Sequence, residues 1–323
     1  MKFIAELCQN HNGSIDNVLR MADAAAESGA THLKIQHIYV QNLSFRPEFE
    51  NGLTQHGITS SICRPWKSEY DRLKGLELSE QDCVRFVEHT KSLGLVPLTT
   101  CFTRGSIKQI LDQGFTSVKV ASYDCASFQM IRELASQFAY LYVSTGATFN
   151  DEVTYAVDIL RKYSKGYTLL HCVTQYPTPL DMMHLNRISW LKSYADEVGF
   201  SDHSLVSRDG ILAAKASIVC GAEIIERHFT ISKADDTKDG PISITQKETS
   251  SLMEFASLSP SDQLEQLNDE YPGWRIMLGQ SERFLSHDEL LNRHYYRGRF
   301  ATPRQIGSHN HYEMINNWEE TPL

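Results

Sequence analysis

The alternation of short apolar runs with amphipathic segments constrains the fold of this chain more than any other feature. Eight runs with high β-propensity recur within the first ~256 residues, and each is followed by a segment whose apolar residues have helical spacing. Eight such units in roughly 250 residues predict a closed (β/α)8 barrel, the TIM barrel. An open doubly wound sheet is disfavoured, because the turn after the first run, QNHNG, is not the GxGxxG motif of that fold.

The expected elements follow one another in strict order along the chain. The strands are Phe3–Leu7, His32–Gln36, Leu95–Thr100, Ser117–Ala121, Tyr140–Ser144, Thr168–Val173, Gly199–Ser204 and Ile224–Phe229. The helices are Ile15–Ala26, Ser79–Gly94, Ser106–Gln113, Phe128–Phe138, Asp151–Lys162, Leu185–Tyr194, Ser207–Val219 and Gln246–Ala256. We therefore assign residues 1–256 to the barrel and residues 257–323 to a C-terminal extension or arm.

Two regions do not follow this pattern. Residues Ile38–Leu78 read as a long loop after the second strand, with one short helix near Glu69–Lys74. Loops of this length inside a compact domain are usually functional or mobile. Near the end of the chain, the histidines of the sequence HNH, His309 and His311, are compatible with a metal cluster, but a surface tail is the favoured interpretation.

Charge and cysteine content exclude several classes of protein. The formal net charge of −9 argues against a nucleic-acid surface and against a polybasic membrane anchor. No apolar run approaches the ~20 residues that a membrane span requires. The seven cysteines form no CxxC pair, which indicates reduced thiols in a cytoplasmic protein.

Polar residues stand at the end of every expected strand. Barrel enzymes carry their chemistry at the C-terminal ends of the strands. Any one of these residues could cap a helix or face solvent, but eight polar strand ends together indicate a site. They are Glu6, Lys34 with Gln36, Thr100 with Thr103, Lys119 with Ser122, Ser144, Thr174 with Tyr176, Ser201 with His203, and Glu226 with His228.

The two lysines and the two histidines carry the most specific signals. Lys34 and Lys119 lie within apolar strands, where a lysine needs an anionic partner to offset its desolvation. His203 and His228 lie 25 residues apart, at the same end of two strands joined by a helix, so they could hold one metal ion. Taken singly, His203 is better explained as a loop cap and His228 as a satisfied core histidine, and it is the other polar strand ends that favour the metal site.

Several motifs together resemble those of the sialic acid synthase family. They are AELCQNHNG, LKIQ, LTTCFT, VKVAS, VSTGA, LLHCVTQYPTP, GFSDHS and IIERHFT, which follow the family's order and spacing from Met1 to about Ala256. Members of this family condense phosphoenolpyruvate with an N-acetylated amino sugar. The resemblance implies the same reaction type for this chain.

The resemblance also implies roles for individual residues. His203 and His228 match the ligands of a divalent metal, and Gln36 matches a residue beside it. Glu6 matches an acid near the reacting carbons, and Tyr176 with Thr174 falls at the sugar position. The phosphoenolpyruvate positions are matched by Lys34, Thr100, Lys119, Ser122, Ser144 and Ser201. Two imidazoles and one amide oxygen as metal ligands favour Mn²⁺, with Co²⁺, Fe²⁺, Zn²⁺ or, less suitably, Mg²⁺ as alternatives.

Two departures from the family pattern fall on the sugar side of the site. Where the family has GPDH, this chain reads KADDTKDGPISI, so that Ile242 replaces an Asp and Asp235, Asp236 or Asp239 is left to substitute for it. The chain also begins an entry segment, RGRFATPRQIG, of the family's C-terminal antifreeze-like domain and ends before the rest of it. We therefore expect an aldose acceptor other than N-acetylmannosamine, with Arg299 or Arg304 replacing an arginine of that domain.

Two rival functions remain open, and a homodimer is one possible assembly. The first rival is another metal-dependent barrel aldolase or lyase that keeps the phosphate site. The second is a non-catalytic ligand-binding relative, against which the retention of Glu6, His203 and His228 argues.

Overall fold

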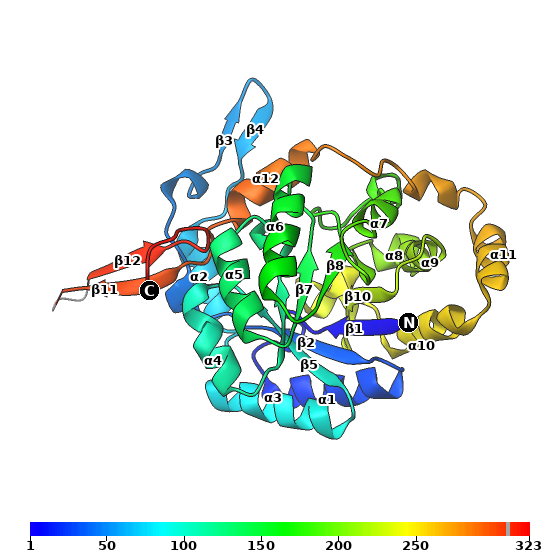
Figure 1. Ribbon diagram of the computed structural model, residues 1–323, viewed down its shortest axis with the longest axis horizontal. Helices are drawn as coiled ribbons and strands as arrows, with labels where there is room; N and C mark the ends of the chain where they lie inside the picture. The colour runs from blue at the N-terminus through cyan, green and yellow to red at the C-terminus, as the bar shows by residue number, and fades with distance from the viewer. Residues whose placement is uncertain (308–310) are drawn as a thin grey trace.

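Eight parallel strands close into a barrel in the order β1-β10-β9-β8-β7-β6-β5-β2 (Figure 1). The computed structural model describes residues 1–307 and 311–323. The predicted (β/α)8 barrel is confirmed, and each strand lies within two residues of its expected bounds. The strands are β1 (Lys2–Glu6), β2 (His32–Gln36), β5 (Val96–Cys101), β6 (Ser117–Val120), β7 (Tyr140–Ser144), β8 (Tyr167–His171), β9 (Val198–Asp202) and β10 (Ile224–His228).

Helices follow each strand and surround the barrel. Their bounds are α1 (Ile15–Glu27), α3 (Glu80–Ser92), α4 (Ile107–Asp112), α5 (Phe128–Gln137), α6 (Asn150–Tyr163), α7 (Asn186–Leu191), α8 (Val206–Asp209), α9 (Leu212–Val219) and α10 (Gln246–Ser257). A capping box formed by Ser79 and Asp82 begins α3. The expected helix Ser207–Val219 is two helices, because Gly210 adopts a φ of 55° and interrupts it.

The two-residue period of the strands separates two layers of core. In β1 and β2, Phe3, Ala5, Leu33 and Ile35 point outward into the main core between strands and helices. Inside the barrel, a smaller buried cluster consists of Ile4, Leu98, Tyr142, Leu170 and Ile224. Toward the C-terminal ends of the strands, the next inward positions are polar. The barrel therefore has an apolar floor below a polar mouth.

The long segment after β2 contains more structure than the sequence predicted. The expected short helix is present as α2 (Trp66–Lys74). A hairpin of β3 (Leu53–Gln55) and β4 (Ile58–Ser61), which was not predicted, projects away from the barrel (Figure 1). Its strands are too short and too polar for a clear alternation, and its turn consists of His56 and Gly57, both with positive φ.

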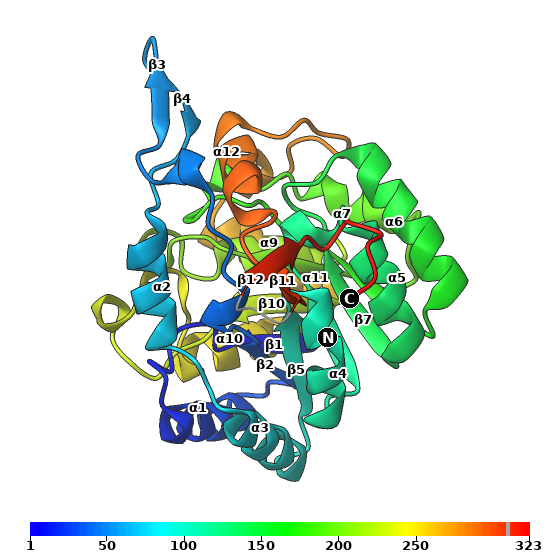
Figure 2. The same cartoon turned by 90° about the vertical axis from the view of Figure 1, so that its left-hand side faces the viewer.

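The C-terminal region forms helices α11 (Pro260–Glu270) and α12 (His287–Tyr296) and a hairpin of β11 (Thr302–Ile306) and β12 (His311–Ile315). After α12 the chain packs against the long segment, where Leu43 and Phe300 form an isolated bridge. The amide of Ser44 donates to the carbonyl of Arg299 at 2.9 Å. Figure 2 shows this hairpin in front of the barrel strands. His309 of the HNH sequence lies outside the described residues.

No helix within residues 1–307 and 311–323 has both the length and the apolar character needed to cross a membrane.

Candidate active site

A cavity of ≈ 360 Å³ lies at the C-terminal ends of the barrel strands. The structure gathers nearly all the predicted site residues around it. Those lining it are Glu6, Lys34, Gln36, Thr100, Lys119, Ser122, Ser144, Tyr176, Ser201, His203 and His228. Part of the wall comes from beyond residue 256, through Asn292, Tyr296, Arg299 and Phe300. The cavity is therefore completed by the C-terminal region.

Among the residues assigned to the substrates or the metal, Thr174 is the one that does not line the cavity. It is fully buried, its hydroxyl lies 2.9 Å from the Ser122 hydroxyl, and its amide donates to Glu289 at 3.3 Å. The regular strand β8 ends at His171, so the two-residue alternation no longer fixes the direction of Thr174. Thr174 therefore contacts the cavity residue Ser122, and its role at the sugar position stays a prediction.

Both buried lysines have carboxylate partners within the barrel. Lys119 Nζ lies 2.8 and 2.9 Å from the two carboxylate oxygens of Glu226. Lys34 Nζ pairs with Glu6 and lies 3.5 Å from Glu226, and it donates to the Thr100 hydroxyl at 3.3 Å. The sequence identified Glu226 as a polar strand end but gave it no role. It is the centre of this network.

Electrostatics keep the network charged. Burial alone would raise the pKa of Glu226, but the ammonium groups of Lys119 and Lys34 hold that pKa well below its ordinary value. Burial would likewise lower the pKa of Lys34, but Glu226 and Glu6 raise it above the usual value. For Lys119 burial prevails, and its pKa is lowered despite Glu226. The neighbouring charges therefore favour the ionised forms of Glu226 and Lys34 against the cost of burial, whereas burial disfavours the ammonium form of Lys119.

The carboxylate of Glu6 is fixed from two sides. One oxygen accepts a hydrogen bond from the amide of Cys8 at 2.7 Å, and the other pairs with Lys34. Glu6 lies at the last position of β1, so its direction follows from the strand, and the turn after the strand closes back on it. A carboxylate held in this way can orient a water molecule or receive a proton without first having to reorder.

The two histidines lie side by side in the cavity wall. Their ring centroids are 5.5 Å apart, and His203 also meets the ring of Tyr176 at 4.5 Å. Burial, reinforced by His228, lowers the pKa of His203 well below its ordinary value, so this ring is neutral, the form that binds metals. Within the described residues, the Nδ1 atoms of both rings are buried without a hydrogen-bond partner.

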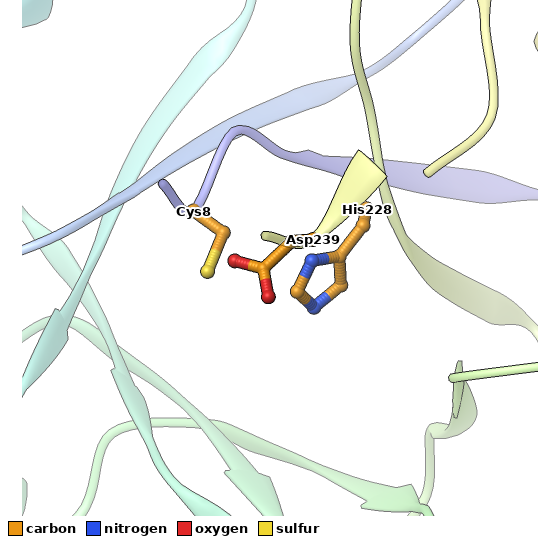
Figure 3. Close-up of side chains that lie close together, drawn as sticks. All are labelled: Cys8, His228 and Asp239. Atoms are coloured by element: carbon orange, nitrogen blue, oxygen red, sulfur yellow. The ribbon is translucent and has the colours of Figure 1, made fainter. Parts of the chain in front are cut away.

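The donor atoms near His228 fit a divalent metal ion. Cys8, His228 and Asp239 each offer one atom, and these atoms all lie within 4.8 Å of one another (Figure 3). His203 lies outside that trio, and Gln36 lines the same cavity. Two unpartnered imidazoles beside a carboxylate match the ligand types of first-row divalent metals.

A buried ion pair fixes the strand ends that carry the histidines. Arg227 and Asp202 are opposite each other in the β9–β10 register, and both side chains are completely buried. Asp202 accepts from the amide of Ser204 at 2.8 Å, and Arg227 donates to the Ser204 carbonyl at 3.0 Å. Each residue of the pair precedes one histidine, so the pair sets the spacing between the two rings.

Comparison with known proteins gives the same family from sequence and from structure. The sequence profile of the NeuB family matches residues 21–259. A protein of Methanocaldococcus jannaschii is 31% identical over 248 residues, covering 76% of this chain and 66% of that relative. The N,N'-diacetyllegionaminic acid synthase of Legionella pneumophila is 31% identical over 260 residues, covering 78% of this chain and 70% of that enzyme.

This chain belongs to the NeuB family. In structure, it resembles the N-acetylneuraminic acid (sialic acid) synthetase of Leptospira borgpetersenii with a TM-score of 0.65 at 26% identity. That match covers 91% of this chain and 90% of the synthetase. The resemblance to sialic acid synthases read from the motifs is therefore confirmed.

Within this NeuB-family barrel, the departure at Ile242 lies in the cavity wall. Ile242 is 6% exposed and lines the cavity, so an apolar side chain occupies the place expected for a carboxylate. Of the three candidate substitutes, Asp239 is the one that reaches the site. Asp235 and Asp236 are exposed, and Asp236 accepts from the amide of Lys233 at 2.9 Å.

Cationic side chains surround the outer part of the same cavity. They are Arg64, Arg72, Lys238 and Arg299. Their carboxylate partner Glu69, which is not in the cavity lining, pairs with Arg299 at 2.5 Å and with Arg72 at 2.9 Å. Arg304, the other arginine considered from the sequence, instead pairs with Glu313 on the C-terminal hairpin. Arg64 lies in the irregular part of the long segment after β2, and Arg72 lies in α2, whose expected short helix the sequence did not orient toward the cavity.

Proposed function

We propose that this chain condenses phosphoenolpyruvate with the aldehyde group of a sugar to give a 2-keto-3-deoxy sugar acid. The methylene carbon of phosphoenolpyruvate forms the new bond to the aldehyde carbon. Water adds at the former enol carbon that carries the phosphate, and phosphate leaves by C–O cleavage. The observation that carries the proposal is one cavity that joins two buried lysines, a ring of hydroxyls, Glu6 and two unpartnered histidines.

The inner half of the cavity suits the phosphate and carboxylate of phosphoenolpyruvate. Lys34 and Lys119 would supply charge, and hydroxyl donors would come from Thr100, Ser122, Ser144 and Ser201. Glu226 already engages two of the three protons of the Lys119 ammonium group, which leaves one donor for the anion. Glu226 therefore orients Lys119 before the substrate arrives.

His203 and His228, with Gln36 beside them, are the proposed holders of a divalent metal, with Mn²⁺ as the ion expected from the family resemblance. When bound, such an ion would polarise the aldehyde oxygen of the acceptor. The neutral ring of His203 is ready to bind without first losing a proton. Glu6, held by Lys34 and the Cys8 amide, would orient the attacking water or accept its proton.

The acceptor is proposed to differ from N-acetylmannosamine and to carry an anionic group. The Ile242 side chain cannot accept a hydrogen bond from a hydroxyl group of the sugar, as the expected Asp would. The outer wall instead presents Arg64, Arg72, Lys238 and Arg299, which outnumber their carboxylate partners. A phosphorylated or carboxylated aldose would satisfy this excess of cations.

Cytoplasmic location is also part of the proposal. Its support is that all seven cysteines are free thiols in the structure, as expected in a reducing compartment. The protein is also proposed to form a homodimer, and a measurement of its molecular mass in solution by light scattering tests this.

The test is phosphate release from phosphoenolpyruvate with a panel of aldoses. N-acetylated, unsubstituted and phosphorylated aldoses are compared by kcat/KM in the presence of Mn²⁺, and a phosphorylated sugar is expected to be preferred. N-acetylmannosamine as the best substrate would contradict the acceptor part. No phosphate release with any aldose, together with phosphoenolpyruvate binding in calorimetry, would favour the ligand-binding relative or another barrel lyase.

A further inference from the structure

We infer that Cys8 and Asp239 are direct ligands of the divalent ion, so that sulfur, oxygen and nitrogen atoms share its coordination. This inference rests on the metal site of the proposed function and adds two ligands to it. The observation is the trio in Figure 3, in which donor atoms of Cys8, Asp239 and His228 all lie within 4.8 Å of one another.

The spacing suits a metal ion without rearrangement of the backbone. Ligand atoms of a tetrahedral ion at about 2.0–2.3 Å from the metal lie about 3.5 Å apart. The donor atoms of the trio lie within 4.8 Å of one another, so a bound ion would have to draw them together by roughly 1 Å at most, through rotation of side chains. In the view of Figure 3 the Asp239 carboxylate lies between the side chain of Cys8 and the ring of His228.

Two buried polar atoms of the trio have no hydrogen-bond partner among the described residues. His228 is 8% exposed, and its Nδ1 is buried without a hydrogen-bond partner among the described residues. One carboxylate oxygen of Asp239 is in the same condition. Buried polar atoms left without partners cost about 1–3 kcal/mol each. A bound cation would satisfy both atoms at once, and the thiol of Cys8, which is 4% exposed, faces the same space.

The loops that carry Cys8 and Asp239 are tied together by Asn10. Its side-chain nitrogen donates to the Phe229 carbonyl and to the Ser243 hydroxyl, each at 2.8 Å. The Ser243 hydroxyl in turn donates to the Asp239 carbonyl at 2.6 Å. The loop after β1 and the loop after β10 are thereby held in one arrangement. The trio is organised before any ion binds.

A thiolate ligand changes which metal the site prefers. Soft sulfur donors favour Zn²⁺, Co²⁺ and Fe²⁺, whereas Mn²⁺ and Mg²⁺ prefer oxygen. The family resemblance by itself led us to expect Mn²⁺. The presence of Cys8 shifts the expected preference of this member toward the softer ions.

The experiment measures the ligands of Zn²⁺ bound to the native protein by X-ray absorption. The expected spectrum contains one sulfur atom at about 2.3 Å from zinc. Cys8→Ser should lose that sulfur signal. Cys172→Ser is the matched control, because Cys172 lines the same cavity but is not in the trio, and it should keep the signal. Asp239→Asn should keep the sulfur signal and weaken Zn²⁺ binding at least tenfold. Loss of a direct ligand should cost no less than the 10–100-fold typical of losing a residue that only supports a ligand.

The outcomes separate this inference from the proposed function. One bound zinc ion with only nitrogen and oxygen neighbours in the native protein would overturn the role of Cys8 and leave the histidine site standing. A sulfur signal lost in Cys172→Ser and kept in Cys8→Ser would overturn it as well. Absence of any stoichiometric metal in the native protein would remove the metal part of the proposed function and this inference together. The decisive spectrum is that of the native protein, so the answer does not depend on the folding of Cys8→Ser.

Discussion

Lys119 Nζ lies 2.8 and 2.9 Å from the two carboxylate oxygens of Glu226, and this pair spans the interior of the barrel. In the strand order of the closed sheet, β6 and β10 stand opposite each other, four positions apart on a ring of eight. The contact therefore connects the two halves of the barrel mouth directly above its apolar floor. Loss of this contact should therefore affect both the stability of the barrel and the proposed binding of phosphoenolpyruvate.

Replacing Lys119 by Met is expected to affect both binding and folding. Loss of the charge should weaken phosphoenolpyruvate binding by about 2–5 kcal/mol, as for one partner of a buried pair. From the sequence alone we would expect folding to be unaffected. The structure corrects this, because Glu226 would lose its closest partner, and breaking a buried pair costs about 3–5 kcal/mol. Lys34, 3.5 Å from Glu226, should keep the loss near the lower end.

Calorimetry with phosphoenolpyruvate and urea unfolding measure the two effects separately. The double variant Lys119→Met with Glu226→Gln removes the unpaired charge, so it should regain part of the stability while phosphoenolpyruvate binding stays weak. Unchanged affinity in a folded Lys119→Met protein would contradict the role of Lys119 in binding.

The predicted site residues were found from the sequence because strand periodicity places them. In β1, β2, β6 and β10, inward positions alternate strictly, so Glu6, Lys34, Lys119 and His228 could be assigned to the mouth once the barrel was recognised. Thr174 shows the limit of this reasoning. It lies three residues beyond the end of β8, where the alternation has stopped.

The partners of those residues could not be read from the sequence. Lys119 and Glu226 are 107 residues apart and meet only across the closed barrel. Cys8, Asp239 and Arg64 lie in loops, and the positions of loop side chains depend on tertiary contacts rather than on periodicity. For Cys8 a weak signal existed, since it follows Glu6 by two residues at the mouth of the barrel.

Removal of Asp202 should destabilise the whole protein. Asp202→Ala leaves the fully buried guanidinium of Arg227 without its partner, which should lower the free energy of unfolding by about 3–5 kcal/mol. Urea unfolding measures the loss. The double variant Asp202→Asn with Arg227→Met, which buries no unpaired charge, should lose less than Asp202→Ala. An equal or larger loss in the double variant would show that packing, and not charge, accounts for the effect.

Removal of either histidine should remove the metal. His203→Ala and His228→Ala are each expected to lower metal affinity more than the 10–100-fold typical of a second-shell change, because a ligand itself is lost. Elemental analysis after gel filtration measures the bound metal, and a chelator should abolish phosphate release in the native protein. Full metal content together with the full rate in either variant would exclude the two-histidine site.

Asp124 should make stability depend on pH. Its buried carboxylate accepts from Ser127 at 2.8 Å and Asn317 at 3.1 Å, yet burial raises its pKa from 3.8 to about 6. The raised pKa means that the stabilising contribution is complete below about pH 4 and is lost as pH rises through about 6. A difference of about two pKa units corresponds to about 3 kcal/mol.

The matched variant Asp124→Asn isolates this contribution from other titrating groups. It cannot ionise, so its stability relative to the native protein should rise by about 2 kcal/mol between pH 4 and pH 7 in urea unfolding, because part of the effect is already present at pH 4. A stability difference that does not change with pH would show that Asp124 titrates normally in the folded protein.

Replacement of Arg299 should select against anionic acceptors. Arg299 lines the cavity, whereas Arg304 pairs with Glu313 outside it, so Arg304→Met is the matched control. In Arg299→Met, Glu69 keeps Arg72 as a partner, which limits the loss of stability.

We expect kcat/KM of Arg299→Met for a phosphorylated aldose to fall about 10–100-fold, or roughly 1.4–2.8 kcal/mol, while phosphoenolpyruvate binding in calorimetry stays unchanged. Arg299→Lys should recover part of the loss, because the charge returns without the planar donor pair. Equal losses for neutral and phosphorylated aldoses would show that Arg299 acts on the shape of the cavity and not on the charge of the acceptor.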